Sequence, residues 1–205
     1  MLPKLATERD RLVRSLIELL AKEEGAIPDF KGVPGFWRGP NGRPRLGSDL
    51  CSSGTPLHHE GPVGFRGKTT KTVLVTEGVL KAATAQHFLP DRYVVASGGV
   101  ATSHREIVKA ARQKILEIAF DADCFTNPHV ARAMASLIAL RKREQQFLSC
   151  DKPTKILAWD RRFKGIDDAL TVGTSLNIWK SLDWLGSLTP ECFDEASHQL
   201  AGILP

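Results

Sequence analysis

The chain has few cysteines, and no two of them are closely spaced. The four are Cys51, Cys124, Cys150 and Cys192, and none of them forms a CxxC motif. Because a zinc ribbon needs such pairs, this class of metal site is not expected. In a reducing compartment the four side chains would be free thiols.

Long apolar runs are also lacking. No segment approaches the roughly 18 apolar residues typical of a membrane span, and Met1-Leu2-Pro3-Lys4 leads into charged residues instead of a signal-peptide stretch. We therefore expect a cytoplasmic protein that makes no membrane contact. With 205 residues, of which 42% are hydrophobic, the chain is long enough for one domain with a real core and an appendage.

Positive charge is concentrated in residues 31–71. This stretch holds seven basic and two acidic residues, which equals the whole formal net charge of +5. The basic residues are Lys31, Arg38, Arg43, Arg45, Arg66, Lys68 and Lys71. Phe36, Trp37 and Phe65 lie among them and can stack on bases. The pattern favours contact with nucleic acid, and a solvated basic loop region is the alternative.

A regular alternation of elements begins at residue 72. Short apolar runs predict strands over 72–76, 92–96, 115–120 and 154–158. Helices are expected over 78–88, 104–113 and 128–147, with a capping box of Ser103 and Glu106 on the second and Asn127 capping the third. This order predicts an α/β fold with a parallel sheet of about four strands joined by right-handed crossovers.

The flanking regions differ from this core in composition. An amphipathic helix is expected over 7–24, followed by Gly/Pro-rich turns that join short antiparallel strands up to residue 71. Two further helices are expected near 174–185 and 191–202. The predicted organisation is an N-terminal region 1–71, a core domain 72–170 and C-terminal helices 171–205.

Acidic residues follow three of the four predicted strands: Glu77, then Asp121 with Asp123, then Asp167 with Asp168. The carboxyl ends of parallel strands line one crevice, so these carboxylates should converge there. Hard oxygen ligands of this kind suit Mg²⁺ or Mn²⁺, with phosphate as a remaining ligand. If extended, a DxD pair directs both side chains to one face. The alternative is that these residues cap helices, and for Asp167 and Asp168 the two readings are equally supported.

Other polar residues adjoin these acidic ones. Lys81 lies one helical turn after Glu77 and would contact phosphate, steady Glu77, or face solvent. Ser97, Gly98 and Gly99 precede a helix, where backbone N–H groups bind anions, although a plain turn is the alternative. The pair His58-His59 lacks partners at metal-ligand spacing and is expected in a loop. Cys124 is expected to be an inert neighbour of the DxD pair.

Together these motifs resemble the Toprim domain, which is shared by bacterial-type primases, type IA and type II topoisomerases and some nucleases. The matching segments are Val75-Thr76-Glu77-Gly78 and Ala119-Phe120-Asp121-Ala122-Asp123, within residues 72–170. The chain looks most similar to Toprim-like domains of plasmid, phage and mobile-element replication proteins that carry a domain of unknown function, DUF3854. Lys81-Ala82, the late motif Lys164–Asp168 and the segment 52–58 carry that similarity.

In the Toprim family the glutamate and the DxD pair bind Mg²⁺, so the resemblance implies that Glu77, Asp121 and Asp123 bind Mg²⁺ or Mn²⁺. It also implies primase-like nucleotidyl transfer in DNA replication. From the residues themselves, we expect Glu77 to accept a proton from a hydroxyl nucleophile if like-charge neighbours raise its pKa. Expected partners are single-stranded DNA or template, nucleotides, and a replicative helicase or another replication protein. A Toprim nuclease, and a nucleic-acid-binding or docking module without catalysis, are the alternatives.

Basic residues and one glycine-containing loop complete the set of expected site residues, and the chain departs from the Toprim pattern at one acidic position. Residues expected to bind nucleic acid or phosphate are Arg38, Arg43, Arg45, Arg66, Lys68, Ser97, Gly98, Gly99 and Lys164. The family's usual third acidic position, close behind DxD, is Phe125 here, and Asp167 and Asp168 would supply that charge instead. A topoisomerase is not favoured, because the only tyrosine, Tyr93, lies inside a predicted strand.

Overall fold

The computed structural model describes residues 27–29, 36–38, 57–60 and 70–201. The expected helix over 7–24 and most of the basic stretch lie outside these residues. Within the Gly/Pro-rich region, β1 (Ile27–Asp29) and β2 (Phe36–Arg38) pair as antiparallel strands. This pair agrees with the short antiparallel strands that the sequence predicts there.

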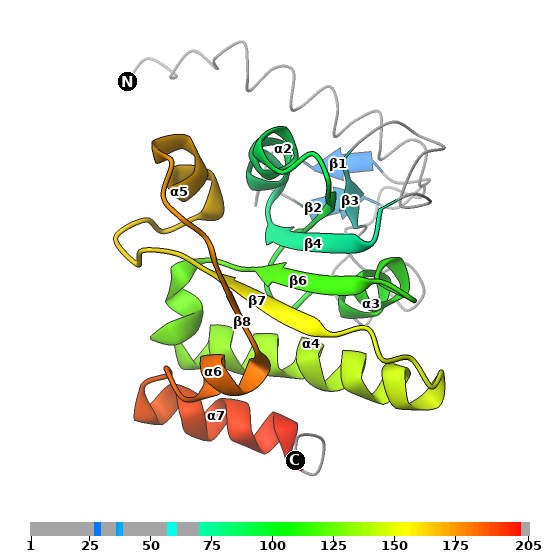
Figure 1. Ribbon diagram of the computed structural model, residues 1–205, viewed down its shortest axis with the longest axis vertical. Helices are drawn as coiled ribbons and strands as arrows, with labels where there is room; N and C mark the ends of the chain where they lie inside the picture. Colours follow the sequence, from blue (N-terminus) through cyan, green and yellow to red (C-terminus); the bar gives the residue numbers. More distant parts are fainter. Residues whose placement is uncertain (1–26, 30–35, 39–56, 61–69, 202–205) are drawn as a thin grey trace.

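A six-stranded mixed sheet forms the centre of the fold (Figure 1). Its order is β3-β5-β4-β6-β7-β8. The strands are β3 (His58–His59), β4 (Thr72–Glu77), β5 (Tyr93–Ser97), β6 (Ile115–Ala119), β7 (Thr154–Ala158) and β8 (Asn177–Trp179). The four central strands are parallel, as predicted, whereas β3 and β8 add an antiparallel strand at each edge.

The strand order reverses in the middle of the sheet. From β4 the chain crosses to β5 on one side, and then returns to β6 on the other side of β4. β4 and β6 are therefore parallel neighbours, with Thr76 opposite Ala119. In open α/β sheets, ligands bind outside the carboxyl ends of the strands at such a reversal.

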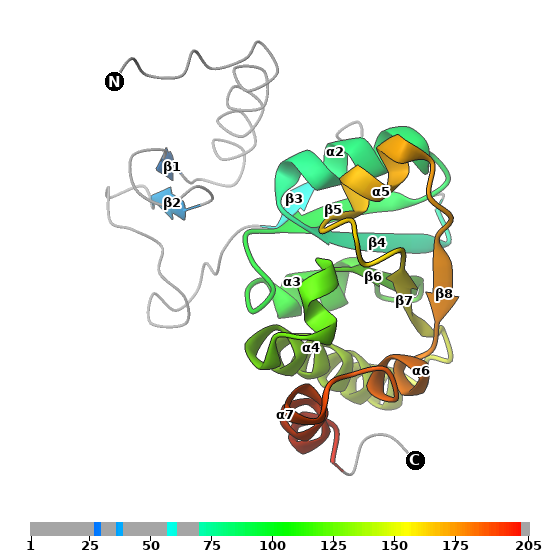
Figure 2. The ribbon, with the colours of Figure 1, turned by 90° about the vertical axis from the view of Figure 1, so that its left-hand side faces the viewer.

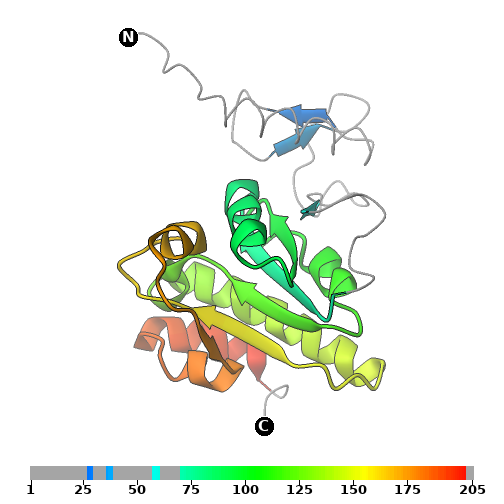
Figure 3. The same cartoon turned by 45° about the horizontal axis from the view of Figure 1, so that its top comes forward.

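Helices cover both faces of this sheet (Figure 2). α2 (Val79–Phe88) and α5 (Ile166–Val172) pack on one face. α3 (His104–Ala110) and α4 (Pro128–Phe147) cover the other, with α7 (Pro190–Leu200) outside α4. In Figure 3, α4 runs along beneath the strands. None of the helices among the described residues is long and apolar enough to cross a membrane.

The strands are buried on both faces because their side chains alternate between two apolar layers. Val73 and Val75 of β4 join the core beneath α3 and α4, whereas Leu74 joins the core beneath α2 and α5. All three side chains are fully buried. This double burial explains why the central strands appear in the sequence as continuous apolar runs.

Three local predictions are wrong. The expected helix over 174–185 contains β8 before the short helix α6 (Ser181–Leu185), because Ile156 of β7 pairs with Trp179 across the sheet. His58-His59 is an edge strand paired with β5, not a loop. Ser103 makes no side-chain cap, since its backbone is left-handed with φ at 58°.

The predicted cap of the long helix is confirmed. The Asn127 Oδ1 atom accepts a hydrogen bond from the His129 N–H at 3.1 Å, and Pro128 is the first residue of α4. This cap defines where α4 begins. A short turn that follows Asp121 and contains Asp123 lies just before this helix.

Candidate functional site

Two of the three acidic positions lie at the reversal of strand order. Glu77 is the last residue of β4, and Asp121 lies two residues beyond the end of β6. Because β4 and β6 are parallel neighbours, both carboxylates are at the same edge of the sheet. Glu77 is half-buried, and the Asp121 side chain is only 5% exposed.

The DxD segment turns sharply instead of continuing as a strand. Asp121 is extended, with φ −55° and ψ 154°, but the residues after it form the 3-10 turn η2 (Ala122–Phe125). The two aspartates are therefore not two positions on one face of a strand, as an extended segment would have made them. The Asp123 carbonyl accepts bonds from the N–H groups of Thr126 and Asn127. Its side-chain Oδ1 atom is buried and has no hydrogen-bond partner.

Lys81 is directed at Asp121. It lies in the first turn of α2, and its ammonium group donates to Asp121 Oδ1. A second ammonium group, on Lys164, lies 3.8 Å from Asp121 Oδ2, and this lysine side chain is 75% exposed. One buried carboxylate thus lies between two lysines, one close and one more distant.

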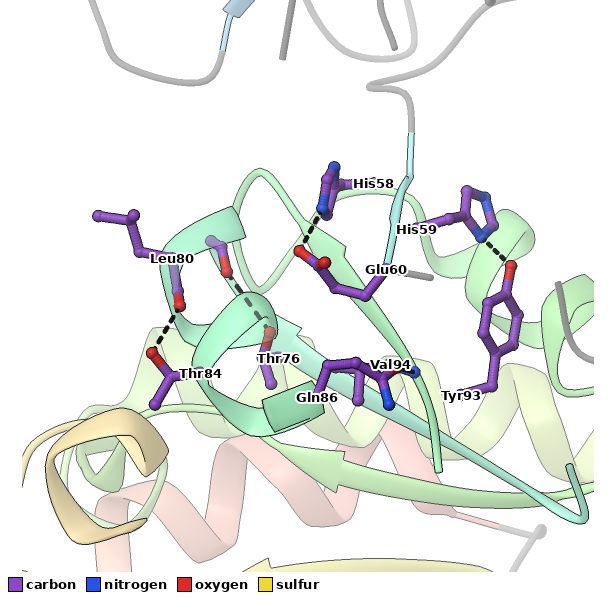
Figure 4. Close-up of polar contacts among 10 residues, drawn as sticks. His58, His59, Glu60, Thr76, Leu80, Thr84, Gln86, Tyr93 and Val94 are labelled. Atoms are coloured by element: carbon purple, nitrogen blue, oxygen red, sulfur yellow. Dashed lines mark hydrogen bonds and ion pairs between the residues drawn. The ribbon is translucent and has the colours of Figure 1, made fainter. Parts of the chain in front are cut away.

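Backbone and side-chain bonds tie α2 to the sheet, and Figure 4 draws two of the residues involved, Gln86 of α2 and Val94 of β5. The Gln86 side chain accepts from the Val94 N–H at 3.2 Å and donates to the Arg92 carbonyl at 2.9 Å. Just before the amino end of α2, the Gly78 N–H donates to the Ser97 carbonyl at 2.9 Å. Both ends of the helix that carries Lys81 are therefore tied to β5 or to the residues beside it.

The surroundings raise the pKa of Glu77 above its ordinary value. Burial of the carboxyl group is the largest cause, and the negative charges of Asp121 and Asp123 act in the same direction. The ammonium groups of Lys81 and Lys164 oppose this shift without cancelling it. A carboxylate with a raised pKa is better able to accept a proton near neutral pH.

The segment after β7 closes over Lys81. The Ala122 N–H, between the two aspartates, donates to the Lys164 carbonyl at 2.9 Å. At Gly165, an added Cβ would overlap Asp167 Oδ1 and would lie 2.8 Å from Lys81 Cε. The absence of a side chain at Gly165 therefore makes room for this approach. The loop is thus fitted against both the DxD turn and the Lys81 side chain.

Asp167 and Asp168 both lie in the first turn of α5, where acidic residues favour the helix dipole. Asp168 is exposed. Asp167 is partly buried, and its Oδ1 atom has no hydrogen-bond partner. Of the two, Asp167 is the one that lies close to Lys81, through the contact at Gly165. Whether either residue binds metal stays a prediction.

By donor type, the site fits a divalent cation. Its donors are carboxylate oxygens, which hard cations prefer, and Asp123 Oδ1 is a buried oxygen without a partner. As arranged, however, the described residues contain no group of three His, Cys, Asp or Glu side chains that could hold a metal ion. Asp121 is already paired with Lys81. The residues suit the ion chemically, while Lys81 is bonded to one of its expected ligands.

The neighbours of the DxD pair are structural. Burial, followed by the charge of Asp123, raises the pKa of the Cys124 thiol to about 12, which agrees with the expected inert role. The Phe125 ring packs edge-on against Trp179, with their centroids 5.7 Å apart. The guanidinium carbon of Arg161 lies 4.1 Å above the same ring. Sequence reasoning missed Arg161, although a run of basic residues after β7 was visible there.

The remaining predicted anion-binding residues divide into two groups. Ser97 is buried at the end of β5, and the Gly99 carbonyl accepts both the N–H and the hydroxyl of Thr102, which makes a plain turn. Anion binding there stays a prediction. Arg38 is described only as part of β2, and Arg43, Arg45, Arg66 and Lys68 lie outside the described residues.

The paired histidines lie on the β3 edge strand, beyond β5. His58 Nε2 lies 2.7 Å from Glu60 Oε1, and His59 Nδ1 lies 2.5 Å from the Tyr93 hydroxyl (Figure 4). Tyr93 is itself in a strand and 7% exposed, as its sequence position predicts. The His59–Tyr93 contact and the backbone pairing hold the edge strand on β5, whereas the His58–Glu60 contact lies within the edge segment itself.

No model of a known protein family matches this chain, and neither does any curated protein or solved structure. Function must therefore be inferred from the residues at the carboxyl ends of β4, β6 and β7.

Proposed function

We propose that this chain is a Toprim-like protein of DNA replication that carries out Mg²⁺- or Mn²⁺-dependent, primase-like nucleotidyl transfer on nucleic acid. One observation carries the proposal. Glu77 and the Asp121–Asp123 turn follow two adjacent parallel strands at the reversal of strand order. That edge is where an open α/β sheet binds its ligand, and the donor types are those of a magnesium site.

Each residue has a role in this proposal. Glu77, Asp121 and Asp123 would hold the divalent cation, with Asp167 the nearest additional carboxylate. When bound, that ion would neutralise phosphate charge and polarise the phosphoryl oxygens. Glu77 would also accept the proton of the attacking hydroxyl group. Its raised pKa belongs to the metal-free protein, and a bound cation would lower that pKa. Lys81 and the exposed Lys164 would bind phosphate oxygens.

The polyanionic substrate is supported by charge. Residues 31–71 carry a formal charge equal to the net +5 of the chain, and Arg161 and Lys164 are exposed beside the acidic turn. Single-stranded DNA or template and nucleotides are the proposed ligands, with stacking on Phe36 or Trp37 as a further contribution. A replicative helicase or another replication protein is the proposed protein partner.

A second candidate is a nucleic-acid-binding or docking module without catalysis. Two observations favour it: Lys81 is bonded to Asp121, and the described residues form no ready three-ligand group. A nuclease would use the same carboxylates, with water in place of the hydroxyl nucleophile. The metal site alone therefore does not separate the two chemistries.

One experiment separates these candidates. The purified chain is supplied with Mg²⁺ or Mn²⁺, both kinds of nucleotide, single-stranded template and labelled single-stranded DNA. Primase-like transfer gives new oligonucleotides, a nuclease shortens the labelled strand, and a binding module shifts its mobility without changing it. Asp121→Asn should remove either product, whereas Asp151→Asn, at an aspartate that is 93% exposed in the loop before β7, should not. Activity that survives in Asp121→Asn would refute the proposed site.

A further inference from the structure

Lys81 occupies a position that conflicts with a bound metal ion. Its ammonium group is hydrogen-bonded to Asp121 Oδ1, and the Asp121 side chain is almost wholly buried, with 5% exposed. A buried carboxylate without a counter-charge is costly, so some cation must accompany Asp121. The hydrogen-bonded cation is Lys81, and the more exposed Lys164 lies 3.8 Å from the other oxygen.

We propose that Lys81 is an internal counter-cation, which stays on Asp121 in the metal-free protein and must leave when a divalent cation binds. This inference rests on the proposed function, because it assumes a cation at that site. It assigns Lys81 a regulating role: the lysine lowers the affinity for metal in the resting protein. Once displaced, its ammonium group becomes available for a phosphate oxygen.

The neighbouring contacts support an exchange between two arrangements. Asp123 Oδ1 is buried without a partner, so one oxygen beside the ion pair still lacks a donor or cation. Asp167 Oδ1 is in the same condition. Unsatisfied buried oxygens cost stability in the metal-free state. As arranged, the described carboxylates form no three-ligand group, so a cation that replaced Lys81 would require the Asp123 or Asp167 side chain to turn toward it.

Gly165 sets the position of Lys81. A Cβ there would overlap Asp167 Oδ1 and would lie 2.8 Å from Lys81 Cε. Both contacts are with the ends of flexible side chains, and the Gly165 backbone, with φ −107° and ψ 159°, suits any residue. Gly165→Ala should therefore fold while it pushes the Lys81 side chain away from Asp121. This variant would move the Lys81 ammonium group without removing any charged group from the protein.

The test is the binding of Mn²⁺ alone. Two quantities are measured: the electron paramagnetic resonance signal of free Mn²⁺ and the melting temperature of the protein. Lys81→Met should bind Mn²⁺ about 10-fold more tightly than the native protein, a size typical of coupling between two ligands. Its metal-free form should melt at a lower temperature, and Mn²⁺ should raise that temperature more than it does in the native protein. Gly165→Ala should also raise the affinity for Mn²⁺ and lower the melting temperature of the metal-free protein, in both cases by less than Lys81→Met.

Lys109→Met is the matched control, because Lys109 is exposed on α3 on the other face of the sheet. It removes one positive charge and should leave Mn²⁺ affinity unchanged. Equal or weaker binding by Lys81→Met, or an equal gain in Lys109→Met, would overturn the inference and leave the proposed function standing. If Lys81→Met does not fold, Gly165→Ala decides. No Mn²⁺ binding by any of these proteins would overturn both proposals together.

Discussion

Two buried carboxylates of the sheet have different surroundings: Glu117, which is paired with Arg92 at the amino end of β5, and Asp121, which lies beyond the carboxyl end of β6. The Glu117 side chain, in the middle of β6, is 4% exposed and accepts a 2.8 Å bond from Arg92 Nε, whose residue directly precedes β5. Arg92 is further fixed by Asp91 at 2.7 Å. Toward the carboxyl ends, Asp121 is shared by Lys81 and Lys164, and the nearby Asp123 Oδ1 and Asp167 Oδ1 atoms have no partner.

Under the proposed function, this contrast distinguishes a structural ion pair from a ligand site; partnerless buried atoms also occur elsewhere in the described residues, at Thr70 and Arg141 among others. Buried polar atoms in stable proteins are almost always paired, and the exceptions concentrate where a ligand binds. The Arg92–Glu117 pair follows the first pattern. The carboxyl end follows the second, with like charges close together and a raised pKa at Glu77. We therefore expect changes at the amino end to alter stability, and changes at the carboxyl end to alter activity.

The largest expected effect is on catalysis. Glu77→Gln should lower any metal-dependent transfer by about 100-fold or more, the usual range for removing a positioned proton acceptor. Steady-state rates measured at saturating Mg²⁺ would check this. Urea unfolding of the same variant should show no decrease in stability. If Glu77→Gln lowered the free energy of unfolding but kept the native transfer rate, Glu77 would be a structural residue, and the expected difference between the two ends of the strands would be contradicted.

At the other end, Arg92→Met should lower the free energy of unfolding by about 3 kcal/mol, because it leaves Glu117 buried without its partner. Urea denaturation is the measurement. Asp91→Asn is the control: Asp91 is 74% exposed, and its change should stay within about 0.5 kcal/mol. Failure of a folded Arg92→Met protein to bind Mn²⁺ would show that the two ends are not independent.

Nucleic-acid affinity offers a smaller test of the same contrast. Lys164→Ala, at the carboxyl end, should weaken binding of a single-stranded oligonucleotide and reduce the log–log salt slope by about 0.7 for each phosphate that the lysine neutralises. Lys152→Ala, at an exposed lysine just before β7, should change neither quantity. Fluorescence titrations at several salt concentrations would measure both. If the two variants behave alike, this edge does not bind the phosphate chain.

The smallest effect is the dependence of stability on pH. The pKa of Glu77 is raised above its unfolded value of 4.5, so the folded chain binds more protons than the unfolded chain just above that pH. Stability contributed at this group should therefore fall as pH rises from 4.5 through the folded pKa. Glu77→Gln should flatten that part of the curve. Parallel urea titrations between about pH 4 and about pH 8 would detect the difference. A steeper curve in the variant would contradict the raised pKa.

The four central strands were predictable because each is a short apolar run buried on both faces, and that pattern is local. The cap at Asn127 was predictable for the same reason, since its bond spans two residues. β8 was not predictable. Its residue Ile178 is exposed, and Trp179 is in a strand because it pairs with Ile156 of β7. Helical spacing in this segment was outweighed by tertiary pairing.

The candidate site was predictable in its residues but not in its contacts. Placement of Glu77 and Asp121 follows from strand ends, which the sequence reveals. The bond from Lys81 to Asp121 joins residues 40 positions apart, so no spacing argument could choose it over Glu77. The turn at Ala122–Phe125 depends likewise on the packing of Cys124 and Phe125 in the core.

One backbone bond connects these parts. The Ala122 N–H lies between the two aspartates and donates to the Lys164 carbonyl, which belongs to the segment after β7. A single amide proton is thus shared by the acidic turn and the loop that covers Lys81. The hydrogen-exchange rate of this one amide can be measured without any substrate. Slower exchange on adding a cation would show that the two segments come together, and faster exchange would show that they separate.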